Sequence, residues 1–476
     1  MPRSPDTSVV VAPLTFYGGL TGALAPFACF LAGVAVLALN GAPDEKGFWP
    51  ILLLALTIGL LLARDRARYA DAMLDGMSQR VVMVMLCAWL FAGVLGAVLG
   101  AAGFIAALAW LARATHLTGG GYVAAAFLAC VIVSTATGTS FGTILLCGPL
   151  LYPAGGGAGA APAALMGAIL AGATFGDSIS PVSDTTIASS GTQHVDIGGT
   201  VRSRLVYVIP AGLVALVASA LLGASADSRV NASVAAATDL TVIGAAPASA
   251  LILLLSPVLV IGMLLVKRHL IEALLFGIAS ATVLALVLGL ITPYDLLHIA
   301  PGTFGATGIV VDGMQRAVGV SVFTLLLVAL VGTLQATDAL DRLVLAAQGR
   351  ASSPRAAESW IVGVVSGAVL LTTHSVVAIL AVGEFARQTG QRFGIPGYRR
   401  ANLLDMTVCT WPFLLPYFLP TILASSASRS GEAYHMPALS AGAIGLYNTY
   451  AWALVLAIVI AVATGYGRRQ EQSPSA

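Results

Sequence analysis

The stretch Gly172-Ala-Thr-Phe-Gly-Asp-Ser-Ile-Ser-Pro-Val-Ser-Asp-Thr-Thr-Ile-Ala-Ser-Ser190 decides the fold class, because it places polar groups between two apolar segments, 160–173 and 205–222. A carboxylate held at the centre of a bilayer costs at least a few kcal/mol, so a lipid-facing helix could not carry Asp177 and Asp184. Pro181 also removes a backbone donor and interrupts any continuous helix. Unwound backbone at membrane depth survives only where protein or a water-filled cavity satisfies it. The stretch therefore predicts a broken transmembrane helix that lines a cation site.

The composition of the whole chain agrees with a membrane protein. Of its 476 residues, 58% are hydrophobic and 9% are charged, and the mean hydropathy is +0.93. A soluble domain carries roughly a quarter charged residues. The five cysteines lie singly in apolar runs, with no CxxC pair or disulfide pattern. No Walker A motif or dinucleotide fingerprint is present, so we expect no cofactor, no ATP coupling and no nucleic-acid partner.

Polar interruptions recur in the same order in two halves. The first half, 1–230, contains a hairpin over about 121–152 and the broken helix over about 160–190. A linker, 231–247, leads to the second half, 248–476, with a hairpin over about 358–386 and a broken helix over about 400–424. Each hairpin is split by its polar tip into arms that we expect to be too short to span. We therefore expect re-entrant hairpins.

The distribution of basic residues supports this layout. With five crossings per half, most arginines lie on one side, and only Lys46, Arg113, Arg229, Arg316 and Arg429 lie on the other. The positive-inside rule then puts both termini in the cytoplasm. An odd number of crossings per half inverts the second half. We predict an all-α polytopic membrane protein of two inverted repeats of five transmembrane helices, each with a re-entrant hairpin and a broken helix, and no arginine within the membrane to hold a carboxylate substrate.

The polar breaks supply the oxygen ligands that a sodium ion prefers. A carboxylate binds a cation when ionised and a proton when not, so the two compete for one group. The candidate ion ligands are Asp177, Asp184, Ser180, Ser183, Thr185, Thr137, Thr139, Ser140 and Asp405, and the candidate substrate contacts in the second half are His374, Ser375, Thr407 and Thr410. The aspartates could instead be helix caps, and the hydroxyls could bond carbonyls of their own helices.

Two of these motifs resemble a known family. Residues Gly172 to Thr186 resemble the signature of the NhaC-type sodium/proton antiporter family, and Thr135-Ala-Thr-Gly-Thr-Ser-Phe-Gly-Thr143 is similar to its first hairpin. The resemblance implies the ion-transporter superfamily, with inverted repeats and an elevator-like transport domain. It also implies exchange of sodium for protons at Asp177 and Asp184, with Ser183, Thr185, Thr137 and Thr139 beside them. In the second half Thr373-His374-Ser375 stands where we expect an acidic residue.

The first functional expectation is therefore a sodium/proton antiporter in a bacterial inner membrane. The alternative is a sodium- or proton-coupled transporter of a small organic acid or amino acid, since relatives of this family resemble it in fold yet carry such solutes. Broken helices at two pseudosymmetric sites argue against a channel. The sequence contains no nucleophilic side chain paired with a general base that would suggest an enzyme. The partners are sodium ions, protons, the bilayer and, if the alternative holds, an organic solute; a homodimer is left open.

Overall fold

The structure is a computed structural model that describes residues 13–39, 45–224, 248–266, 268–299, 305–434 and 436–468. The predicted linker 231–247 lies outside these ranges. The first half contains ten α-helices: α1 (Leu20–Leu39), α2 (Phe48–Leu62), α3 (Arg66–Met77), α4 (Arg80–Ala101), α5 (Phe104–Ala114), α6 (Gly120–Thr137), α7 (Ser140–Gly157), α8 (Pro162–Ile179), α9 (Asp184–Gln193) and α10 (Ile197–Ala224), with a 3₁₀ turn, η1 (Glu45–Gly47), before α2.

The second half is also helical, apart from one short strand pair. Its helices are η2 (Ala248–Leu254), α13 (Leu255–Leu265), α14 (Leu270–Val287), α15 (Pro293–Leu296), α16 (Ile309–Gln335), α17 (Ala339–Ala347), α18 (Pro354–Thr372), α19 (Ser375–Arg392), α20 (Gly397–Val408), η3 (Trp411–Phe413), α21 (Leu419–Ser428), η4 (Arg429–Tyr434), α22 (Ala441–Leu446) and α23 (Thr449–Thr464). Strands β1 (His298–Ile299) and β2 (Ala306–Thr307) pair antiparallel beside α15. The all-α prediction is wrong at these four residues only, where the backbone groups of a loop bond each other.

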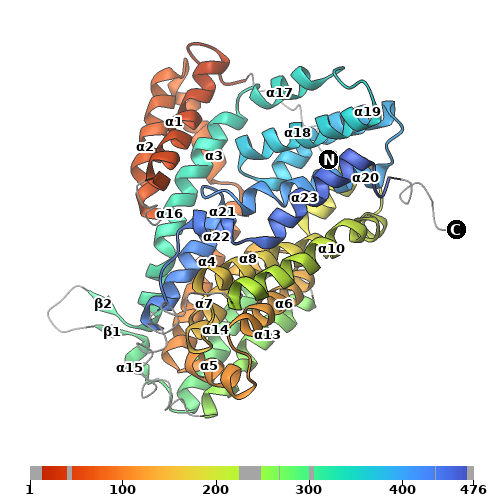
Figure 1. Cartoon of the computed structure of the whole chain (residues 1–476). Helices are drawn as coiled ribbons and strands as arrows, with labels where there is room; N and C mark the ends of the chain where they lie inside the picture. Colours follow the sequence, from red (N-terminus) through yellow and green to blue (C-terminus); the bar gives the residue numbers. More distant parts are fainter. Residues whose placement is uncertain are drawn as a thin grey trace, which may run out of the picture.

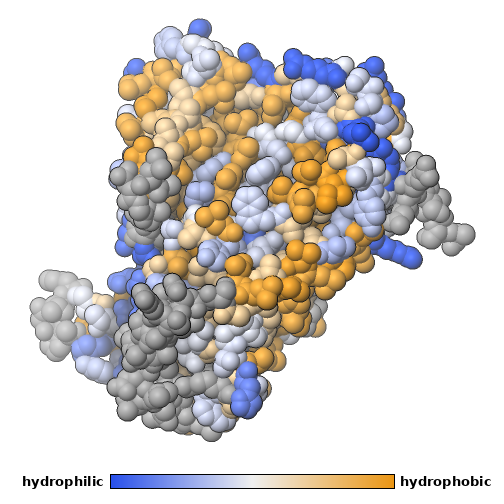
Figure 2. Space-filling view, viewed as in Figure 1, coloured by the Kyte–Doolittle hydropathy of each residue, from blue (hydrophilic) through white to orange (hydrophobic). Residues whose placement is uncertain are grey.

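The described residues include eight helices or helix pairs that are long and apolar enough to cross a membrane. The chain is therefore a multi-pass membrane protein. Exposed apolar side chains of α10, such as Leu213, Val217 and Leu221, follow a helical spacing of four residues, which is typical of a lipid-facing stripe. Figure 2 shows apolar surface over α1, α2 and α10, with hydrophilic residues gathered along the upper edge.

The helix breaks lie where the sequence predicted them. Helix α6 ends before Gly138, α8 ends before Ser180, and α18 ends before Thr373. One expectation on length needs correction. The hairpin arms α6 and α7 are 18 residues each, and α6 is long enough to span, so the arms are not too short. The apolar run over 81–111 forms two helices, α4 and α5, because the chain turns at Gly103, whose φ is +79°.

The two halves show a matching pattern of helix contacts, and helices of each half pack against helices of the other. Helix α6 packs on α8 as α18 packs on α20, and α7 contacts α21 as α19 contacts α9. Helix α4 packs against its counterpart α16, and α10 packs against its counterpart α23. In Figure 1, α1, α2, α3 and α16 form one side of the molecule, while α8, α10, α20 and α23 lie together on the other. The two helix breaks and the two hairpin tips lie in the second of these groups.

Candidate functional site

The first polar break is docked onto the tip between α6 and α7. The Ser180 hydroxyl donates to the carbonyl of Thr135 (2.8 Å) and accepts from the amide of Val182 (3.3 Å). Gly138 has a φ of +68°, and a Cβ there would stand 2.7 Å from the Val182 carbonyl oxygen. Both features require glycine, because side chains disfavour this φ and no room exists for one. The break and the tip therefore form one rigid unit.

Helix α8 also approaches α6 closely on the way to this break. A Cβ on Gly176 would lie 2.6 Å from the Val131 carbonyl oxygen, and the Ser134 hydroxyl donates to the Ala173 carbonyl (2.6 Å). Small residues and hydroxyl contacts of this kind drive helix association in membranes, where burial of apolar surface supplies little. This packing fixes the end of α8 that carries Asp177.

Asp177 is buried in the last turn of α8, with 7% of its surface exposed. Its Oδ1 atom is enclosed and has no hydrogen-bond partner within the described ranges. The hydroxyls of Ser140, at the start of α7, and Ser183, at the cap of α9, approach this carboxylate. The Ser183 hydroxyl also lies 3.0 Å from that of Thr185. Three of the predicted ligands, Ser140, Ser183 and Thr185, are thus gathered beside Asp177.

Asp184 differs from Asp177 in its surroundings. It is the first residue of α9 and is exposed. The carboxylate whose charge acts on Asp177 is Asp405, more than two hundred residues later in the chain. The two aspartates of the signature are therefore not equivalent: one is enclosed, and the other stands at the surface of the break.

The second break holds a buried ion pair that the sequence analysis did not predict. Asp405 of α20 is 1% exposed, and its Oδ2 atom lies 2.5 Å from Nη2 of Arg204 of α10, which is fully buried. Arg204 lies about 10 Å along α10 from its first residue. Arg204 is thus a buried arginine beside the second break, which the sequence analysis did not identify. The physical reason is local: Arg202 and Arg204 lie on opposite faces of one helix, so only one of them can point to solvent.

Arg204 connects the two broken helices. Its Nη1 donates to the Ser178 carbonyl (2.9 Å) and to the Thr186 hydroxyl (3.0 Å), and its Nε donates to Oδ1 of Asn402 (3.2 Å). Ser178 lies in the last turn of α8, where carbonyls have no helical partner. The guanidinium thus satisfies a freed carbonyl of the first break and the carboxylate of the second. A guanidinium suits this position because its donors form a planar fork.

These contacts leave the centre with an unbalanced charge. Arg204 neutralises Asp405, and Asp177 is the further buried carboxylate. A buried charge without a partner is strongly disfavoured in a low-dielectric interior. When Asp177 is ionised, no basic side chain is paired with its charge among the described residues.

Three of the remaining predicted residues donate hydrogen bonds to backbone carbonyls. Thr407 and Thr410 donate to the carbonyls of Leu403 (2.7 Å) and Thr407 (2.6 Å). The Ser375 hydroxyl donates to the Val408 carbonyl (3.2 Å), which ties the second hairpin tip to the second break. His374, at that tip, has a buried Nδ1 without a partner in the described part of the chain.

Two threonines of the first tip shape it rather than face Asp177. Thr139 caps α7 by accepting from the amide of Gly142 (3.4 Å). Thr137 donates weakly to the carbonyls of Ser134 and Thr139, both at 3.5 Å. These contacts agree with the alternative that hydroxyls satisfy backbone groups of their own turn.

A second buried ionic cluster lies nearer the arginine-rich ends of the helices. Glu358 and Arg399 are fully buried and 3.2 Å apart, and Arg468 also contacts Glu358 (2.8 Å). Arg399 further donates to the Tyr207 hydroxyl (2.5 Å). On the exposed edge, Asp196 accepts from the Tyr398 hydroxyl and from the amide of Gly199. These donors, first that hydroxyl, hold the pKa of Asp196 below its ordinary value.

No cluster of three or more histidine, cysteine or acidic side chains occurs among the described residues. Sites for transition metals are built from such clusters. The oxygen donors around Asp177 fit instead a hard monovalent cation. Of the two predicted sodium ligands, Asp177 is buried and Asp184 is exposed.

Comparison with known proteins identifies the first half of the chain. Residues 7–221 match the model of the Na+/H+ antiporter family. The chain is 28% identical over 242 residues to the Na+/H+ antiporter NhaC of Alkalihalophilus pseudofirmus, covering 49% of this chain and 50% of that protein. It is 38% identical over 102 residues to a malate-2H+/Na+-lactate antiporter of Bacillus subtilis, covering 21% and 22%.

A third relative is the arginine/ornithine antiporter ArcD of Halobacterium salinarum, 30% identical over 218 residues, 41% of this chain and 43% of that protein. The chain thus matches about half the length, or less, of these curated relatives. The resemblance carried by the two polar motifs is confirmed within the matched part. Over residues 7–221, the chain is similar to the Na+/H+ antiporter family.

Proposed function

We propose that the protein is a secondary active transporter that exchanges sodium for protons at Asp177. The observation that carries this proposal is the enclosed Oδ1 of Asp177, which has no partner among the described residues, although the nearby Asp405 carboxylate is already neutralised by Arg204. One buried carboxylate is left for one monovalent cation. A sodium ion or a proton neutralises it, and the two cannot occupy it together.

The proposed exchange follows from this electrostatic balance. Moving the centre across the membrane with an ionised, empty Asp177 would carry a buried, uncompensated charge, which is costly. Movement with either sodium or a proton bound avoids that cost. The Ser140 and Ser183 hydroxyls supply further oxygen ligands beside Asp177. Asp184, exposed at the start of α9, is placed to attract a cation toward the break.

The architecture that suits this mechanism is a pair of inverted repeats with two re-entrant hairpins. The exchange of helix contacts between the halves, α6–α8 with α18–α20 and α7–α21 with α19–α9, supports it. So does the one-sided distribution of arginines. We place the protein in the bacterial inner membrane with both termini in the cytoplasm, on the same distribution of charge.

The experiment uses proteoliposomes that contain buffer and a trapped pH-sensitive dye, with an imposed sodium gradient and no organic solute. Sodium-dependent proton movement is expected in the native protein. It should be lost in Asp177→Asn and reduced in Asp184→Asn, whereas Asp71→Asn, at an exposed aspartate of α3, should match the native rate. Native rates in Asp177→Asn protein would refute the proposed role of this carboxylate.

A second candidate is a sodium- or proton-coupled transporter of a small organic acid or amino acid. It is favoured by the buried, unpartnered Nδ1 of His374 beside the second break and by the names of two relatives. The same vesicles distinguish it: protons or sodium would then move only after malate, lactate, arginine or ornithine is added. Arg204 is not the clamp for such a substrate, because its nitrogens already bond four protein groups.

A further inference from the structure

A cavity of about 370 Å³ lies between α4, α16, α7 and α21, away from the aspartate centre. Near the start of α16 it is lined by Gln315, Arg316, Ala317, Gly319 and Val320, and this helix is about 40 Å long. The other end of α16 adjoins the arginine-rich segment around α3 and α17. The cavity therefore lies toward the membrane face opposite to most of the arginines.

The polar lining of this cavity is mainly cationic. Lys46 of η1, Arg316 of α16 and Arg429 of η4 line it, and Glu432 is its one acidic residue. These are three of the five basic residues that the charge distribution assigns to the outer side. Arg316 is exposed and forms no ion pair within the described ranges. A concave surface in which one sign of charge predominates concentrates ions of the opposite sign. Three basic side chains against one acidic side chain favour anions over sodium here.

The rest of the lining is mainly apolar, and the indole of Trp89 adds one hydrogen-bond donor. Trp89, Val320, Leu145 and Leu423 contribute to the wall, and the volume lies in the range of small-molecule pockets. Trp89 is 2% exposed, and its indole N–H is buried without a partner in the part of the chain that the structure describes. A cavity that offers cationic groups as well as apolar walls fits an organic anion better than an inorganic one.

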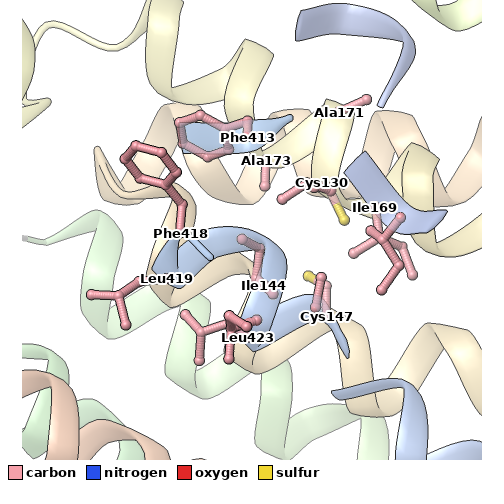
Figure 3. Close-up of a cluster of buried hydrophobic side chains, with 14 of the residues drawn as sticks. Cys130, Ile144, Cys147, Ile169, Ala171, Ala173, Phe413, Phe418, Leu419 and Leu423 are labelled. Atoms are coloured by element: carbon pink, nitrogen blue, oxygen red, sulfur yellow. The ribbon is translucent and has the colours of Figure 1, made fainter. Parts of the chain in front are cut away.

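Apolar side chains of α7 and α21 lie between the first hairpin tip and this cavity along each helix. Figure 3 shows Ile144 and Cys147 of α7 beside Leu419 and Leu423 of α21, in a buried hydrophobic cluster. Ile144 follows the tip residue Ser140 by one turn, and Leu423 also lines the cavity. The residues that line the cavity do not include Asp177 or the hydroxyl residues beside it.

We propose that this cavity is a binding site for a small organic carboxylate, with the carboxylate held by Arg316, Lys46 and Arg429 and the apolar part against Trp89. The proposal does not depend on sodium/proton exchange. Recognition of a carboxylate by guanidinium and ammonium groups is among the stronger polar contacts in proteins. The site would let the protein respond to an organic anion on the side opposite to the arginine-rich face.

The test is calorimetric titration of the purified full chain in nanodiscs, with N-methylglucamine salts so that no sodium is present. Propionate and succinate are the probes, and sulfate is the inorganic comparison. Binding of at least one carboxylate is expected. It should weaken about ten-fold or more in Arg316→Gln and in Lys46→Gln. Arg355→Gln, an exposed arginine outside the cavity, should bind like the native protein.

Asp177→Asn separates this site from the proposed cation centre. Unchanged carboxylate binding in that variant supports an independent site, even if sodium/proton exchange is lost or was never present. Loss of binding in Asp177→Asn would overturn the proposal, since the anion would then depend on the aspartate centre. Equal binding by Arg316→Gln and Arg355→Gln, no binding of either carboxylate, or sulfate binding as tight as theirs would each overturn it too.

Discussion

The ion pair between Arg204 and Asp405 gives a quantitative prediction about how the two halves are held together. The Arg204→Gln variant leaves the Asp405 carboxylate 1% exposed, with the Ser189 hydroxyl at 3.3 Å as its remaining side-chain partner from another helix. Removing one member of a buried pair typically costs about 3–5 kcal/mol, because an uncompensated charge stays behind. We expect Arg204→Gln to lower the free energy of unfolding by this amount, and Asp405→Asn to lower it similarly.

The double variant Arg204→Gln/Asp405→Asn separates the pair from its surroundings. It contains no buried charge at either position, so its cost should be smaller than the sum of the two single costs by about 3 kcal/mol. The matched control is Arg202→Gln, two residues earlier in α10, which is exposed and should change stability by at most about 0.5 kcal/mol.

The measurement is reversible unfolding of the purified protein in mixed micelles of rising SDS content, followed by tryptophan fluorescence. Single and double variants are compared at one protein concentration and one pH. Costs that add within about 0.5 kcal/mol would refute the pairing of these side chains. An effect of Arg202→Gln as large as that of Arg204→Gln would refute the difference in burial on which the prediction rests.

Three further predictions concern packing, pH and the second ion cluster. Gly176→Ala should cost about 1–3 kcal/mol through overpacking against α6, whereas Gly191→Ala, with open space at its Cβ, should be neutral or stabilising, as thermal unfolding would report. The lowered pKa of Asp196 means that the stability it supplies is complete above about pH 4 and is lost as pH falls through the lower folded-state value. Asp196→Asn should therefore remove part of the acid sensitivity of the melting temperature between pH 5 and about pH 2. Glu358→Gln should destabilise by about 3–5 kcal/mol, whereas Glu384→Gln, at an exposed pair, should have little effect in the same SDS titration.

Much of the fold could be predicted from local sequence, because backbone breaks have local causes. Pro181 interrupts a helix whatever surrounds it, and Gly138 permits the left-handed turn between α6 and α7. The Thr373-His374 interruption predicted the boundary between α18 and α19 in the same way. The length of the hairpin arms was predicted wrongly for α6, whose 18 residues are long enough to span.

The sequence by itself determined that this is a multi-pass membrane protein with carboxylates at its helix breaks, since hydropathy and the cost of intramembrane charge act residue by residue. The tertiary structure alone decided that Asp177 is enclosed and Asp184 exposed, and that Arg204 neutralises Asp405. In a membrane, the faces of a helix toward lipid and toward protein are both apolar, so hydropathy does not tell which face is inward. Pairing across two hundred residues depends on how α10 docks against α20, and that docking leaves Asp177 without a basic partner among the described residues.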